Sequence, residues 1–217
     1  MTRDFIKSRL ELIVNRYEKL GLIHSPLYNN LKQKISNKAW IADLADMLSK
    51  IENSESIFYI NKEITTSKND QRVLEMFSEI DGARWLVKGN IDGKYSKISY
   101  LKKNPSIKSP DFFALRGNEN YAVEIKMLSP QDTDENKFIL RMISKINKEA
   151  IQQLLSFFTH DRFTKGLIFI WTHELIHLEK IDYSTLDQML KQKIKKQTFP
   201  IGIYMTLYHY GIWDFHL

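Results

Sequence analysis

The chain has 217 residues, no cysteine and a formal net charge of +6, from 32 lysines and arginines against 26 acids. Its length suits one domain with or without a small appendage, and 43% hydrophobic with 27% charged residues argues against intrinsic disorder. The missing cysteines exclude a disulfide framework, a thiolate zinc site and a cysteine nucleophile. The charged N-terminal residues and the short apolar runs predict no signal peptide, no membrane partner and a cytoplasmic location.

The first 50 or so residues carry helical patterns. Apolar residues recur at helical spacing over 4–20, and Gly21 follows as a C-cap. Ser25 and Pro26 suit the N-cap and first turn of a second helix, and a third is predicted over 38–51. The basic surplus is compatible with a polyanion partner.

The rest of the chain mixes strand and helix patterns, which predicts an α/β fold. The polar segment 52–55 is interpreted as a linker between a helical accessory or recognition segment, 1–55, and a second domain, 56–217. The elements expected in the second domain are a helix over 67–80, strands over 83–91, 96–101, 111–115 and 121–127, a helix over 136–158, a strand over 166–171, a helix over 183–196, and one or two strands within 199–215.

One group of residues carries recognisable chemistry. Asp111 opens one predicted strand, Glu124 lies late in the next, and a hairpin would bring the two carboxylates together. Glu124 and Lys126 are two apart on a strand, so their side chains share one face, while Ile125 points into the core. Two close carboxylates suit a hard dication, Mg²⁺ or Mn²⁺. An ammonium beside that metal can orient a water or stabilise developing negative charge, as metal-assisted phosphodiester hydrolysis requires.

The pattern Pro110-Asp111, then Glu124-x-Lys126, resembles the PD-(D/E)xK nuclease superfamily. The resemblance covers about residues 67–173, roughly half of the chain. It implies a restriction-endonuclease-like fold, a mixed β-sheet core flanked by helices, here with an N-terminal helical appendage.

The same resemblance implies two further site residues on helices. An acid from the helix before the hairpin is expected, and Glu75 fits that place, with Glu79 as the second choice. A glutamine followed four residues later by an aromatic residue is matched by Gln153 and Phe157, although Phe157 lacks the hydroxyl of the more usual tyrosine. Gln153 would orient the substrate or a site residue.

The function implied is a magnesium-dependent deoxyribonuclease, expected to be an endonuclease of restriction, phage-defence or toxin type. Asp111 and Glu124 would hold the metal, with the Ile125 carbonyl and Glu75 as further ligands, and Lys126 would position the attacking water. DNA is expected because most such relatives act on DNA, and RNA stays open. A homodimer or a partner protein of a multi-component system is also expected.

A competing motif lies further along the chain. Residues His173, Glu174 and His177 form a literal HExxH sequence, which on a helix would bind Zn²⁺ and supply the general base of a metallopeptidase. The preceding segment resembles a strand, and no obvious third ligand follows. The alternative interpretation is a strand end followed by a turn with surface histidines.

A third possibility is a DNA-binding protein without cleavage activity. A lysine cluster near a predicted helix end suits phosphate contacts and equally suits a solvated helix C-terminus. Aromatic residues near the C-terminus suit base stacking, a dimer surface, or ordinary strand packing. These residues are Lys191, Lys193, Lys195 and Lys196, and Tyr204, Tyr208, Tyr210 and Trp213.

Overall fold

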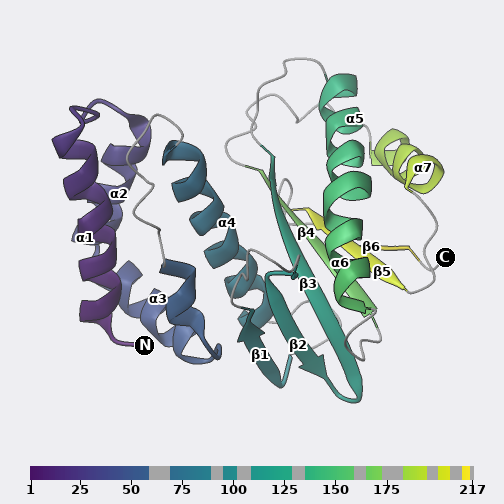
Figure 1. The fold of residues 1–217 in the computed structure, drawn as a ribbon, viewed down its shortest axis with the longest axis horizontal. Coiled ribbons are helices and arrows are strands. Elements are labelled where there is room, and N and C mark those ends of the chain that lie inside the picture. The colour runs from purple at the N-terminus through teal and green to yellow at the C-terminus, as the bar shows by residue number, and fades with distance from the viewer. Residues whose placement is uncertain are drawn as a thin grey trace.

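The computed structural model shows an α/β architecture in which a six-stranded mixed sheet lies between two helical layers (Figure 1). Helix α4 packs against one face of the sheet, with α1, α2 and α3 on its outer side, and helices α5, α6 and α7 cover the other face. The structure describes residues 1–58, 69–88, 95–101, 109–128, 135–158, 165–172, 183–194, 200–205 and 212–215.

None of the helices within these ranges combines the length and the apolar character needed to cross a membrane.

The strands follow one another across the sheet in chain order. Strands β1 to β3 form an antiparallel meander, β3, β4 and β5 run parallel, and β6 returns antiparallel to β5. Gly117, with φ +58°, makes the tight turn between β2 and β3. The strands are β1 Lys97–Tyr100, β2 Phe112–Arg116, β3 Glu119–Leu128, β4 Lys165–Thr172, β5 Ile201–Met205 and β6 Ile212–Phe215.

The three N-terminal helices form as the sequence predicts, and each is local in origin. Helix α1, Arg3–Lys19, starts with the Thr2 hydroxyl accepting from the Phe5 amide, and Gly21 follows its end with φ +70°. Pro26 opens α2, Pro26–Ser36, and the Asn37 side chain caps α3, Lys38–Ser49.

Helix α4, Asn69–Lys88, corrects the prediction of a strand over 83–91, of which residues 89–91 lie outside the described ranges. Ala83 and Leu86 are buried on the helix face that packs against the sheet. Gly82 allows the close approach, since a Cβ built there would lie 2.2 Å from Ile125 Cδ1. Packing against β3 therefore decides this segment, whatever strand propensity its aromatic and β-branched residues have.

The long helix predicted over 136–158 is one continuous helical path with a wider turn inside it. Helix α5, Glu135–Lys145, passes through a π-helical turn, η2, Ile146–Ala150, into α6, Ile151–Phe158. Its apolar face packs with α7, Tyr183–Lys193, on the second face of the sheet. The interruption lies directly before the predicted site residue Gln153.

Segment 52–55 joins the sheet edge instead of standing apart from it. The Glu52 amide donates to the Ile98 carbonyl at 2.9 Å, and the Glu52 carbonyl accepts from the Tyr100 amide at 2.8 Å. The 3₁₀ turn η1, Ser54–Phe58, follows at once. One apolar core then runs from α1 through α3 and η1 to α4 and the sheet, across the predicted boundary at residue 55.

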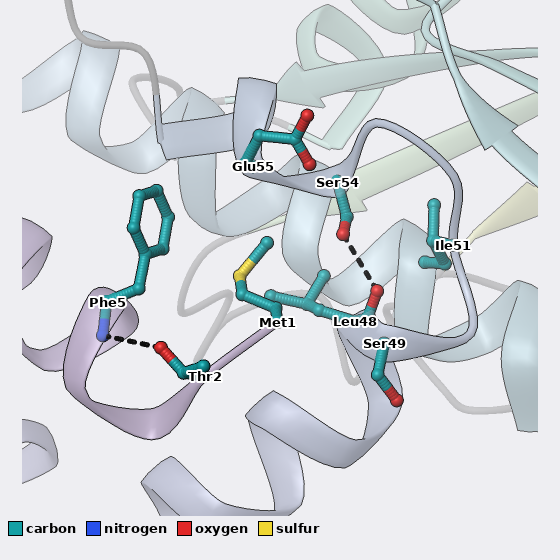
Figure 2. A pocket seen from close by; sticks show the side chains of 8 residues that line it. All are labelled: Met1, Thr2, Phe5, Leu48, Ser49, Ile51, Ser54 and Glu55. Atoms are coloured by element: carbon teal, nitrogen blue, oxygen red, sulfur yellow. Dashed lines mark hydrogen bonds between the residues drawn. The ribbon is translucent and has the colours of Figure 1, made fainter.

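The junction of α1, α3 and η1 leaves a surface cavity of about 340 Å³ (Figure 2). Met1, Phe5 and Leu48 supply apolar walls, and Glu55 lies at its polar side. The Ser54 hydroxyl donates to the Leu48 carbonyl at 2.8 Å, which ties η1 to the end of α3.

The Gly82 contact predicts a conditional effect on stability. Gly82→Ala should lower the free energy of unfolding by about 1–3 kcal/mol, because overpacking against Ile125 outweighs the gain in helix propensity. In an Ile125→Val background the clashing Cδ1 atom is absent and only the milder 3.1 Å contact with Cγ1 remains, so the same change should cost clearly less. Urea unfolding of the four proteins in this cycle measures both effects. An equal loss in both backgrounds would contradict the contact.

The contacts of Glu119, at the start of β3, predict that part of the stability is lost in acid. Hydrogen bonds from Lys165, at 2.7 Å, and from the Tyr121 hydroxyl lower the pKa of Glu119 to about 2. A lowered folded-state pKa stabilises the fold above the ordinary value of 4.5, and this contribution is lost as the pH falls toward about 2.

Glu119→Gln should therefore destabilise the protein at neutral pH and match the parent protein near pH 2. Glu11→Gln, at an exposed pair with Lys7, is the matched control and should change stability little at either pH. Denaturant midpoints measured between pH 7 and pH 2 test the trend, and a constant difference across that range would refute it.

Candidate functional site

Strand β3 presents two different faces. Ile125 and Met127 belong to the core beneath α4, whereas Ala122 and Leu128 belong to the core beneath α5 and α6. The intervening residues Glu124 and Lys126 therefore face the α5–α6 side, as the two-residue spacing predicts. Lys126 Nζ lies 2.7 Å from Glu124 Oε1, with side chains only 12% and 2% exposed. This is a desolvated ion pair and differs in kind from the exposed pairs on the helices.

Asp111 stands at the start of β2 and is 2% exposed. Phe112 pairs with Val123, so one further step of the register places Asp111 beside Glu124. The Asp111 amide donates to the Val123 carbonyl at 3.0 Å, and its Oδ2 accepts from the Ile125 amide at 2.8 Å. The hairpin thus brings the two predicted carboxylates to adjacent positions and fixes Asp111 to the backbone of the ExK segment.

The helical layer completes the surroundings of Lys126. Gln153 Oε1, on α6, accepts from Lys126 Nζ at 2.5 Å, and Glu149 Oε2, in the π turn, lies 3.8 Å from the same nitrogen. Lys145 Nζ donates to the Met127 carbonyl at 3.0 Å. The π turn changes the rotation of the helix between these residues, and such turns recur at functional sites.

Glu149 was not identified from the sequence, although a signal for it exists. It precedes Gln153 by four residues, so both lie on one helix face. Its side chain is 53% exposed, so it borders the site from the solvent side.

The two acids considered on the helix before the hairpin, Glu75 and Glu79, have different surroundings. Glu75 pairs within α4, with Arg72 at 2.8 Å and Gln71 at 3.3 Å. Glu79 is 3% exposed and accepts from the Tyr100 hydroxyl at 2.9 Å. The chain continues from Tyr100 to Leu101, whose amide donates to the Asp111 carbonyl at 2.9 Å.

Both helical acids, Glu75 and Glu79, affect the pKa of Arg72. Burial of Arg72 lowers its pKa, but the hydrogen bond that Arg72 donates to Glu75 and the charge of Glu79 outweigh that effect and raise the pKa above its ordinary value. The guanidinium therefore stays charged beside them. Glu79 is thus bonded to the sheet through Tyr100 of β1, whereas Glu75 pairs within its own helix.

The donor set can be tested for a metal. Within the ranges that the structure describes, no three His, Cys, Asp or Glu side chains are grouped to hold an ion. Mg²⁺ characteristically uses one or two carboxylates and takes its other ligands from water and substrate phosphates. Asp111 and Glu124, two buried hard-oxygen donors, fit that requirement, and the Ile125 carbonyl follows Glu124 directly in the chain.

Other predicted residues fall wholly or partly outside the described part of the chain. His173, Glu174 and His177 do so, directly after β4. Of the lysine cluster, Lys191 pairs with Asp187 at 2.7 Å, and Lys193 is exposed at the end of α7. Lys195, Lys196, Tyr208 and Tyr210 are not described, and Tyr204 and Trp213 are placed only as backbone of β5 and β6.

Comparison with protein-family models, with curated proteins and with solved structures finds no match for this chain.

The buried ion pair predicts an asymmetric mutational response. Lys126→Met leaves the Glu124 charge without its 2.7 Å partner, which should lower the free energy of unfolding by about 3–5 kcal/mol. The double change Glu124→Gln/Lys126→Met removes both charges and should recover most of that loss. Chemical unfolding of both variants measures this, and a double variant as unstable as the single one would show that the pair is not the cause.

Proposed function

We propose that the chain is a divalent-metal-dependent nuclease of the PD-(D/E)xK type that hydrolyses DNA phosphodiester bonds. The observation that carries the proposal is the placement of Lys126, whose ammonium lies 2.7 Å from Glu124 and bonds Gln153. Glu124 in turn adjoins Asp111 in the hairpin register. Buried, clustered ionisable groups are costly to the fold and are characteristic of functional sites.

The metal would be Mg²⁺ or Mn²⁺, held by Asp111 and Glu124 with the Ile125 carbonyl. When bound, it would supply Lewis-acid stabilisation of charge on the phosphate. Lys126 would orient the attacking water and offset negative charge that develops on phosphorus-bound oxygens. Gln153 would hold the Lys126 ammonium in place, because its amide oxygen accepts a hydrogen bond from that group.

The helical acid in this proposal is Glu79 in preference to Glu75. Glu79 is buried and connected through Tyr100 to the strand beside Asp111, whereas Glu75 makes its ion pair with Arg72. The mixed sheet between helical layers is compatible with a restriction-endonuclease-like core. The helices of 1–55 would then serve recognition of DNA or of a partner, including a second copy of the chain.

Cleavage of supercoiled plasmid DNA in Mg²⁺ or Mn²⁺ tests the proposal. The parent protein should cut, and cutting should be lost with EDTA. Asp111→Asn and Glu124→Gln/Lys126→Met should each lower the rate by roughly 10²-fold or more, because they remove metal-binding or charge-stabilising groups. Linear, single-stranded and RNA substrates in the same assay define the substrate class.

The controls separate chemistry from folding. Lys97→Met removes an exposed ammonium on the edge strand β1, outside both the site and the 1–55 helices, and should leave cleavage unchanged. Circular dichroism should show the double variant folded. Cleavage that persists in a folded Glu124→Gln/Lys126→Met protein would overturn the assignment.

A further inference from the structure

A second cavity, of about 120 Å³, lies on the opposite face of the sheet from Lys126. It is formed where α2 and α3 meet α4 and the end of β4. Trp40, Phe77 and Trp171 supply aromatic surface, and aliphatic side chains fill the space between them. Its volume is far below that of a drug-sized pocket, so it suits one small planar group.

Lys34 is the unusual member of this lining. Its Nζ lies 4.8 Å from the ring centre of Trp40 and 5.7 Å from that of Phe77. Burial lowers the pKa of Lys34, and the negative charge of Asp81 only partly opposes that effect. Within the described ranges, the interactions of this ammonium are these aromatic and long-range charge contacts, without a hydrogen bond or ion pair. An ammonium in this setting can donate to an acceptor that enters the cavity.

The neighbouring charges are already committed to one another. Asp81 Oδ2 accepts from Trp171 Nε1 at 2.7 Å, and Asp81 Oδ1 lies 3.2 Å from Arg84. Arg84 also reaches Asp43 at 3.4 Å. With Lys34, these two acids and two bases sum to zero charge, so the cavity has no net attraction for an anion.

We propose that this cavity binds a single nucleobase that carries a ring carbonyl. The base would stack on the aromatic lining, and its carbonyl oxygen would accept from Lys34 Nζ. Stacking on aromatic side chains contributes about 1–3 kcal/mol per base, and lysine commonly donates to the guanine O6.

Three features argue for a base over other small groups. A phosphate would meet apolar walls and a neutral charge cluster. An aliphatic group would leave the Lys34 ammonium desolvated with no acceptor. A planar heterocycle with a carbonyl satisfies both the rings and the ammonium. Adenine lacks that carbonyl, so guanine should bind more tightly than adenine.

The base can come from a free nucleotide or from an unstacked position of a bound strand. Trp171 pairs with Met127 in the sheet, one residue beyond the Lys126–Ile170 pair. The cavity and the candidate active site therefore lie at the same end of β3 and β4, on opposite faces. The inference uses none of the proposed catalytic residues, so its failure would leave the proposed nuclease activity untouched.

Indole N–H resonances give a direct test on the full chain. With the signals of Trp40 and Trp171 assigned by single Trp→Phe changes, guanosine 5′-monophosphate should shift both. Adenosine 5′-monophosphate should shift them more weakly, and ribose 5-phosphate should not shift them. The two nucleotides share sugar and phosphate, so their difference isolates the base.

Lys34→Met keeps the aliphatic stem and removes a charge that burial disfavours, so the fold should survive. Its affinity for guanosine 5′-monophosphate should fall about tenfold or more, since a hydrogen bond to a charged group is lost. Lys38→Met, an exposed lysine outside the cavity lining, is the matched control and should bind as the parent protein does.

A single-stranded oligothymidine and the same strand with every base removed distinguish the two sources. Shifts with the oligothymidine but not with thymidine 5′-monophosphate or the base-free strand identify a base from a strand, and shifts with the mononucleotide alone identify a free nucleotide. The proposal is overturned if neither class shifts the indoles, if ribose 5-phosphate shifts them equally, or if Lys34→Met binds unchanged.

Discussion

Successive side chains of strand β3 point to opposite faces of the sheet, so one face receives Ile125 and the other receives the Glu124–Lys126 ion pair. The packing of the helices on both faces depends on this alternation. Ile125 meets Gly82, which seats α4 against one face. Glu124 and Lys126 point to the other face, where α6 presents Gln153. A register slip of β3 by one residue would turn its charged side chains into the apolar core beneath α4. It would also turn its aliphatic side chains toward Gln153 on the other face. The hydrogen bond from the Ile125 amide to Asp111 holds the hairpin against such a slip.

The polar cluster on β3 is expensive to maintain. Two buried carboxylates and an ammonium lose much of their hydration on folding. The attraction within a buried ion pair such as Glu124–Lys126 generally does no more than offset that desolvation cost. Well-packed apolar residues would serve stability at least as well. The π turn adds to the argument, since it places Glu149 and Gln153 toward Lys126 within an otherwise regular helix. Together these features are easier to explain by chemistry than by folding.

The parts of the fold that the sequence predicts are those set by local rules. Gly21 follows the end of the first helix and Pro26 opens the second, as predicted, and the spacing of Glu124 and Lys126 fixes their common face. Residues 83–88 are helical although Trp85 and Val87 have strand propensity, because contact with β3 overrides that propensity. The choice between Glu75 and Glu79 also depends on tertiary contacts, as does the existence of the π turn, so periodicity alone could not settle either.

The Lys34 cavity lies beyond sequence analysis for the same reason, because its walls come from three helices and a strand end. The cavity is also one of several places where the N-terminal helices meet the sheet domain directly. Glu52 extends the sheet edge, and the apolar core continues from α1 to β3 and β4. Helices α2 and α3 then supply one side of a cavity whose other side is made by α4 and by Trp171 of β4. Because β3 and β4 pair in parallel through Lys126 and Met127, a ligand that touches Trp171 would contact the same strand pair that carries the polar cluster.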